Sequence, residues 1–116
     1  MAVGIVFNPG HRQLRWTRAC RVDKVPLDGA LHVSLENSEI CLVNSRGRFY
    51  ALIDECSHGQ VRLSEGDVYD GVVECYMHGS EFDLATGRPL CLPATEPVTT
   101  FEVRVHDGIV EVGLSG

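Results

Sequence analysis

The chain has 116 residues, of which 44% are hydrophobic, and its 16 acidic residues outnumber 10 lysines and arginines to give a formal net charge of −6. This length suits one domain that buries about two-thirds of its unfolded surface. The negative charge argues against nucleic acid and anionic membranes as partners. The apolar run from Ala2 to Phe7 lacks a basic region before it and falls far short of the roughly 20 residues of a membrane span. We therefore expect a cytoplasmic protein without a secretory signal.

Short apolar or alternating segments separated by turn residues predict an all-β fold. The first strand is expected over residues 16–22, and the second contains Leu31, Val33 and Leu35, which alternate with period two. Two further strands are expected over residues 40–43 and 49–53, with turns at residues 37–38 and 44–47. No window of ten or more residues shows a helical period.

The second half of the chain continues this pattern with tighter turns. Asp70-Gly71 lies between two short apolar segments, which predicts a hairpin with a primed turn. Residues 82–84 are expected to pair across the turn at residues 85–87, and strands over residues 98–105 and 109–112 form the closing hairpin. The predicted architecture is a β-sandwich in a single domain of residues 1–116. A small three-stranded subdomain is expected over about residues 54–97.

Two short segments carry the residues best suited to metal chemistry. Cys56-Ser57-His58 is followed, after sixteen residues, by Cys75-Tyr76-Met77-His78, so each segment supplies one cysteine and one histidine. Iron–sulfur clusters are normally held by four thiolates, and in the Rieske variant two histidines replace two cysteines on one iron. The order and spacing therefore predict a Rieske-type 2Fe–2S cluster with four ligands: Cys56, His58, Cys75 and His78.

A structural zinc site is the competing interpretation, because zinc is also held by two cysteines and two histidines. Zinc fingers usually place their first ligands as Cys-x2–4-Cys and keep the histidines together. Here each segment supplies one of each residue type, which favours iron and sulfur over a structural zinc-binding module.

The other cysteines, histidines and nearby acidic residues receive simpler predictions. An odd remainder of cysteines suggests reduced cytosolic thiols, and small buried hydrophobic roles are expected for Cys20, Cys41 and Cys91. Surface positions rather than ligand roles are expected for His11, His32 and His106. A solvated acidic face is expected at Asp54, Glu55 and Glu65.

Further motifs surround the predicted ligands: Leu63-Ser64-Glu65-Gly66, Gly79, Phe82-Asp83 and Thr86-Gly87. Together with the ligand quartet they resemble the Rieske-type ferredoxins of bacterial aromatic-ring-hydroxylating dioxygenase systems, over roughly the whole chain. The resemblance implies the Rieske fold, with the small subdomain binding the cluster. It also implies that Cys56 and Cys75 bind the inner iron, while His58 and His78 bind the outer iron and face solvent.

This resemblance implies an electron carrier rather than an enzyme. Such a ferredoxin takes one electron from an NAD(P)H-dependent flavin reductase and passes it to a terminal ring-hydroxylating oxygenase, as a monomer with transient partners. Because the sequence ends shortly after the closing hairpin, we expect no catalytic iron domain. The alternative is a small Rieske-fold subunit of a nitrite reductase or another oxidoreductase complex, which usually lacks the ligands.

The resemblance also bears on the redox potential. Rieske proteins of cytochrome bc complexes join their two loops by a disulfide, at positions that correspond here to Val61 and Met77. The tyrosine of those proteins, which donates a hydrogen bond to a ligand sulfur, corresponds here to Phe82. Their serine, which donates to a bridging sulfide, is retained as Ser80. These differences imply the low-potential ferredoxin branch. We call the surface where the edges of His58 and His78 emerge the histidine tip. We expect neutral or apolar residues around it: Gln60, Met77, Pro93 and Ala94.

Overall fold

The computed structural model describes residues 14–115, and this range is built almost entirely from β-strands. The strands are β1 (Leu14–Arg21), β2 (Gly29–Leu35), β3 (Ser38–Ser45), β4 (Arg48–Ile53), β5 (Asp67–Tyr69), β6 (Val72–Glu74), β7 (Glu81–Asp83), β8 (Thr100–His106) and β9 (Ile109–Ser115). Two single-turn 3-10 helices, η2 (Val22–Lys24) and η3 (Leu63–Glu65), were not predicted, because three residues show no helical period. The all-β prediction is confirmed. Within the described range, no helix is long and apolar enough to span a membrane.

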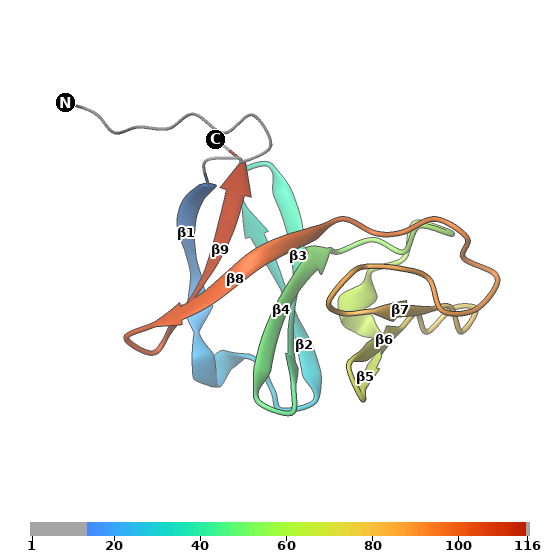
Figure 1. The fold of residues 1–116 in the computed structure, drawn as a ribbon, viewed down its shortest axis with the longest axis horizontal. Coiled ribbons are helices and arrows are strands. Elements are labelled where there is room, and N and C mark those ends of the chain that lie inside the picture. The colour runs from blue at the N-terminus through green and yellow to red at the C-terminus, as the bar shows by residue number, and fades with distance from the viewer. Residues whose placement is uncertain (1–13, 116) are drawn as a thin grey trace.

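Six strands form one antiparallel sheet in the order β1-β9-β8-β4-β3-β2, and β5-β6-β7 form a separate small sheet (Figure 1). The large sheet has its shortest strand pairing at its centre, where β4 and β8 pair only through Ala51–Phe101 and Leu52–Thr100. Its two halves curl around a shared apolar core. That core contains Val25, Leu35, Ile40, Leu42, Ala51, Val110, Val112 and Leu114. The predicted sandwich is thus one sheet folded on itself.

Strand β3 is buried on both faces, and this attaches the small sheet to the large one. Ile40 and Leu42 point into the core between the two halves, whereas Cys41 and Val43 pack in a second core with the small sheet. Fully buried members of that second core include Leu63, Val73 and Phe82. A continuous apolar run is expected of a strand covered on both sides. This packing fixes the small sheet, and the loops at its ends, against the body of the protein.

The turns follow their sequence signals closely. Asp70 and Gly71 have φ values of 49° and 77°, which confirms the predicted primed turn. The strand predicted to start at residue 98 instead begins at Thr100. The reason is that the Val98 N–H donates to the Gly87 carbonyl at 2.9 Å, which ties residue 98 to the turn after β7.

This tie makes Gly87 a sensitive position. Gly87 has φ +76°, and a Cβ there would lie 2.1 Å from the Val98 carbonyl oxygen, whereas Gly47, with φ +87°, has nothing within 4 Å of such a Cβ. Both alanine substitutions strain the backbone, but only Gly87→Ala also creates a clash. We expect Gly87→Ala to lower the free energy of unfolding by about 2 kcal/mol more than Gly47→Ala. Urea denaturation of both variants measures this difference, and equal losses would show that the turn moves away from Val98 at little cost.

Candidate metal centre

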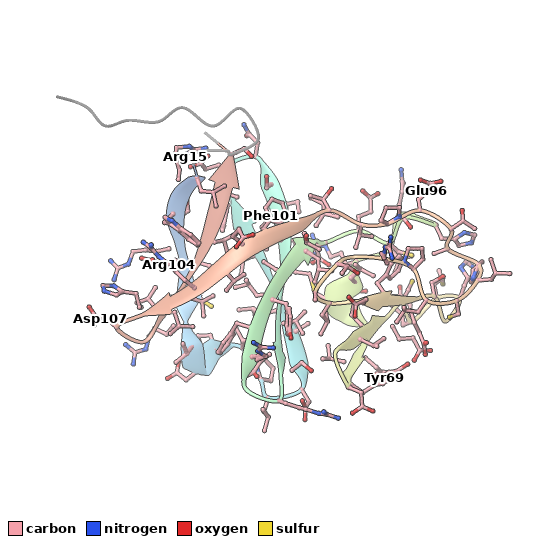
Figure 2. All side chains as sticks on the ribbon, in the orientation of Figure 1. Arg15, Tyr69, Glu96, Phe101, Arg104 and Asp107 are labelled. Carbon is pink, nitrogen blue, oxygen red and sulfur yellow. The ribbon has the colours of Figure 1, made fainter. Side chains whose placement is uncertain are left out.

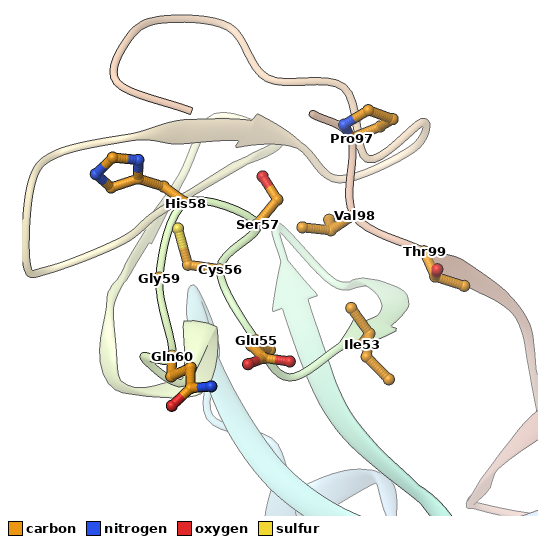
Figure 3. A pocket seen from close by; sticks show the side chains of 10 residues that line it. All are labelled: Ile53, Glu55, Cys56, Ser57, His58, Gly59, Gln60, Pro97, Val98 and Thr99. Carbon is orange, nitrogen blue, oxygen red and sulfur yellow. The ribbon is translucent and has the colours of Figure 1, made fainter. Parts of the chain in front are cut away.

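The first ligand loop follows β4 and presents its thiol inward and its imidazole outward. The Cys56 N–H donates to the Val61 carbonyl at 2.8 Å, and the Gly59 N–H donates to the Cys56 carbonyl at 3.2 Å, so the loop closes on itself. Cys56 is 3% exposed, whereas His58 is exposed. Figure 3 shows the Cys56 sulfur on the same side of the loop as the His58 ring, with Gln60 directed away from both.

The second ligand loop joins β6 to β7 and repeats this arrangement. The Cys75 N–H donates to the Ser80 carbonyl at 2.8 Å, and the Gly79 N–H donates to the Cys75 carbonyl at 3.0 Å. Gly79 has φ +76°, a conformation that glycine adopts without strain. Cys75 is 1% exposed, while His78 is exposed. Each loop therefore buries its cysteine and displays its histidine.

The two loops bring the four predicted ligands to one end of the molecule. The His58 and His78 rings lie 5.0 Å apart between centroids, at an interplanar angle of 88°. The two thiols are also neighbours: burial raises the pKa of the Cys56 thiol, the Cys75 thiol raises it further, and the backbone N–H groups of His58 and Gly59 lower it. Amides directed at a sulfur stabilise a metal-bound thiolate.

The donor set fits a Rieske cluster, which takes two thiolates on one iron and two imidazoles on the other. The thiols form one pair inside the protein and the imidazoles form another at its surface. Within residues 14–115, no group of three or more His, Cys, Asp or Glu side chains has the geometry to hold a single metal ion.

A proline-rich segment, residues 89–97 with Pro89, Pro93 and Pro97, packs beside the second ligand loop. The Ala94 N–H donates to the Ser80 hydroxyl at 3.1 Å, and the Leu90 N–H donates to the Glu81 carbonyl at 2.7 Å. The expectation that Ala94 lies on the exposed tip is wrong, because Ala94 is 3% exposed and belongs to the second core. Gln60 and Met77 are exposed as expected, and Pro93 is half-buried.

Large apolar side chains near this end are exposed, and Met77 is the one among them whose exposure was predicted from the sequence. Leu92 is 74% exposed, and three others are just over half exposed. We call this set the apolar collar: Tyr76, Met77, Leu90 and Leu92. It comes from the second ligand loop and the proline-rich segment, which lie together through the bonds of Ser80 and Glu81.

Two residues expected on the surface are mostly buried. The Asp54 carboxylate is 0% exposed and the His32 side chain is 22% exposed, and their oxygen and nitrogen atoms lie 2.6 Å apart. His32 lies on the polar side of an alternating strand, but η3 contacts β2 and covers that side. The position of Asp54, two residues before the predicted ligand Cys56, is the feature of the sequence that could have indicated its burial.

Some of the remaining predictions for single residues are confirmed, and others are wrong. Glu55, Glu65 and His106 are exposed as predicted, and His11 lies outside the described residues. Cys41 is buried as predicted and Cys20 is half-buried, but Cys91 is exposed, with its thiol 3.4 Å from the Gly79 carbonyl oxygen. All five cysteines are free thiols in the structure.

A sequence model described as "Rieske [2Fe-2S] domain" matches residues 15–102. The 3-phenylpropionate/cinnamic acid dioxygenase ferredoxin subunit of Escherichia coli K12 is 45% identical over 97 residues, covering 83% of this chain and 91% of the relative.

Solved structures agree with this result. The Sphingomonas yanoikuyae B1 ferredoxin has a TM-score of 0.81 and 29% identity, covering 86% of this chain and 99% of its own. A chain in the complex of reduced oxygenase and oxidized ferredoxin of carbazole 1,9a-dioxygenase has a TM-score of 0.79 and 33% identity, covering 84% of this chain and 92% of its own. The chain belongs to the Rieske [2Fe-2S] domain family, and its cofactor is a Rieske-type 2Fe–2S cluster.

Proposed function

We propose that this protein is the ferredoxin of an aromatic-ring-hydroxylating dioxygenase system. It receives one electron from an NAD(P)H-dependent flavin reductase and delivers it to a terminal oxygenase, acting as a cytoplasmic monomer. The observation that carries the proposal is the exposed His58–His78 pair, with its rings 5.0 Å apart, above two buried thiols. The relative from Escherichia coli is named as a dioxygenase ferredoxin subunit, which supports the same role.

In this proposal the four residues of the two loops hold the cluster. Cys56 and Cys75 would hold one iron, and His58 and His78 would hold the other. The bound cluster supplies reversible one-electron transfer at about −150 to +300 mV. The cysteines are buried away from water, while the exposed imidazoles lie where a docked partner can reach them.

The potential of this protein should lie at the low end of that range. Phe82 has no hydroxyl to donate to a ligand sulfur, and Val61 and Met77 replace the cysteines of the interloop disulfide. Ser80 acts in the opposite direction, because it accepts the Ala94 N–H and keeps its own hydroxyl hydrogen for donation. We expect a midpoint near about −150 mV by spectroelectrochemical titration. A midpoint above zero would contradict the low-potential assignment.

Reconstitution tests the proposed function directly. The purified protein should contain iron and acid-labile sulfide, and an aromatic-ring dioxygenase supplied with its reductase should require this protein for product formation. The components of the 3-phenylpropionate/cinnamic acid dioxygenase are the natural first choice, given the 45% identity of their ferredoxin. Zinc without sulfide would establish the structural zinc-binding module instead. A loaded cluster that served only a nitrite reductase would establish that alternative subunit role.

A further inference from the structure

A serine stands between two of the proposed ligands and binds a distant part of the chain. Ser57 follows Cys56 and precedes His58, and its hydroxyl donates to the Glu96 backbone carbonyl at 2.6 Å. Ser57, His58 and Pro97 line one groove, in which Figure 3 shows Ser57 between the other two. Within residues 14–115, this is the one hydrogen bond that joins the first ligand loop, residues 54–62, to the proline-rich segment.

The proline-rich segment is itself fixed to the second ligand loop. The Leu90 N–H donates to the Glu81 carbonyl at 2.7 Å, and the Ala94 N–H donates to the Ser80 hydroxyl at 3.1 Å. Ala94 is buried in the second core, which anchors the middle of the segment. Two hydrogen bonds and one buried side chain therefore hold the segment against the second ligand loop.

The carbonyl that Ser57 binds also has a fixed position. The Val98 N–H donates to the Gly87 carbonyl at 2.9 Å, which holds the chain two residues beyond Glu96. Pro97 favours extended conformations of Glu96, because the proline ring clashes with a helical conformation of the residue before it. Figure 2 shows Glu96 at the end of the molecule that carries the small sheet. A hydroxyl bound to such a carbonyl can hold the first ligand loop in one place.

We propose that Ser57 is a positioning residue for the cluster. Its hydroxyl joins the first ligand loop to the proline-rich segment, and the segment joins it to the second ligand loop. His58 and His78 thereby keep the relative position that binding to one iron requires. The inference rests on the proposed ligand set. Every hydrogen bond in this path joins uncharged groups, either two backbone groups or a backbone group and a serine hydroxyl.

Two effects should follow from removing the hydroxyl of Ser57. The first ligand loop should separate from the proline-rich segment more often, by about fivefold for one hydrogen bond of ordinary strength, and the cluster should be lost faster. The imidazole of His58 should also change its orientation, and groups that orient a metal ligand tune the electronic properties of the metal. The second effect separates a positioning role from general support of the fold.

The test compares Ser57→Thr with Ser57→Val in the cluster-loaded protein. Threonine and valine have nearly the same shape, but only threonine keeps a hydroxyl that can bind the Glu96 carbonyl. Ser57→Val should lose the visible absorption of its cluster about fivefold faster in the presence of an iron chelator. Its reduced-state EPR spectrum should shift, whereas Ser57→Thr should match the wild type in both properties.

Ser34→Ala is the matched control for the loss of a serine hydroxyl. Ser34 is exposed like Ser57, and its hydroxyl donates to Glu39 at the same distance of 2.6 Å, but it lies on β2 of the large sheet. This variant should keep the wild-type rate of cluster loss and the wild-type EPR spectrum.

The outcomes distinguish this inference from the proposed function. A wild-type protein without a Rieske spectrum would refute the proposed ligand set itself. A normal wild type with equal behaviour of Ser57→Val and Ser57→Thr would overturn only the role of the Ser57 hydroxyl. Faster cluster loss from Ser57→Val at an unchanged EPR spectrum would also overturn it, since the hydrogen bond would then support the fold without orienting His58.

A second variant keeps the inference testable if Ser57→Val does not take up a cluster. Pro97→Ala releases Glu96 from its restricted conformation but leaves the Ser57 hydroxyl in place. Pro97 is exposed, as is Pro26 on the segment between η2 and β2, so Pro26→Ala is its control. We expect faster cluster loss and a shifted EPR spectrum for Pro97→Ala alone. Equal behaviour of the two proline variants would show that a fixed Glu96 carbonyl does not position the loop.

Discussion

Replacing His78 with alanine should abolish the reduced-state EPR signal and the visible absorption of the Rieske cluster. His78 is one of the two exposed imidazoles, and its ring centroid lies 5.0 Å from that of His58. If each ring supplies one ligand to the outer iron, the loss of either leaves that iron with a vacant position and a site open to water. His58→Ala should therefore give the same result.

The parts of the two ligand loops that bind the cluster should also lose order in these variants. Metal binding and folding are coupled, so removal of a ligand removes part of the folding free energy of the loops that bind it. The six-stranded sheet has a separate core and should stay folded, as circular dichroism of the β-sheet signal would show. His106→Ala is the matched control, because His106 is exposed on β8 and should keep a normal spectrum. A His78→Ala protein with an unchanged EPR signal would rule out the ligand assignment.

The sequence predicted the parts of this site that depend on local spacing. A Cys-x-His and a Cys-x-x-His segment are recognisable because each fits in one short loop, and both loops fold as tight turns. The Asp70-Gly71 turn was likewise predictable, since few residue pairs tolerate two positive φ values in succession. These features require no knowledge of distant contacts.

The residues that were predicted wrongly all depend on partners far along the chain. Asp54 is buried because the Ser64 N–H of η3 donates to it and because the ring of His32, 22 residues away, lies 2.6 Å from its other carboxylate oxygen. Ala94 is buried because its N–H reaches Ser80, whereas Cys91 in the same segment is exposed, with its thiol 3.4 Å from the Gly79 carbonyl oxygen. Composition and periodicity assign a charged residue to the surface and a small one to the core, and tertiary pairing overrides both rules here.

The exposed leucine at position 92 should control delivery of the electron to the oxygenase. Leu92→Glu should slow this step at least about tenfold, because a charge buried at a docked surface loses its hydration without gaining a partner. Transient redox encounters typically bury less than about 1,200 Å², so a single such residue is a large part of the interface. Leu92 is 74% exposed, and its replacement should leave the fold, the spectrum and the potential unchanged.

Leu27→Glu provides a closely matched control. Leu27 is 68% exposed and belongs to the segment between η2 and β2, which lies away from the two ligand loops (Figure 1), so the same change of charge should leave electron transfer unaffected. Stopped-flow reduction of the oxygenase by each ferredoxin measures the rates.

The dependence of the electron-transfer rate on salt separates long-range electrostatic attraction from contact at the histidine tip. The net charge of −6 should draw a partner with a positive patch, and added salt should slow association by screening that charge. The apolar collar is neutral, so the defect of Leu92→Glu should persist at high salt, where long-range attraction is already lost. If Leu92→Glu and Leu27→Glu transferred electrons equally fast at every salt concentration, the oxygenase would have to dock on another face. The exposed histidines would then not be the point at which the electron leaves.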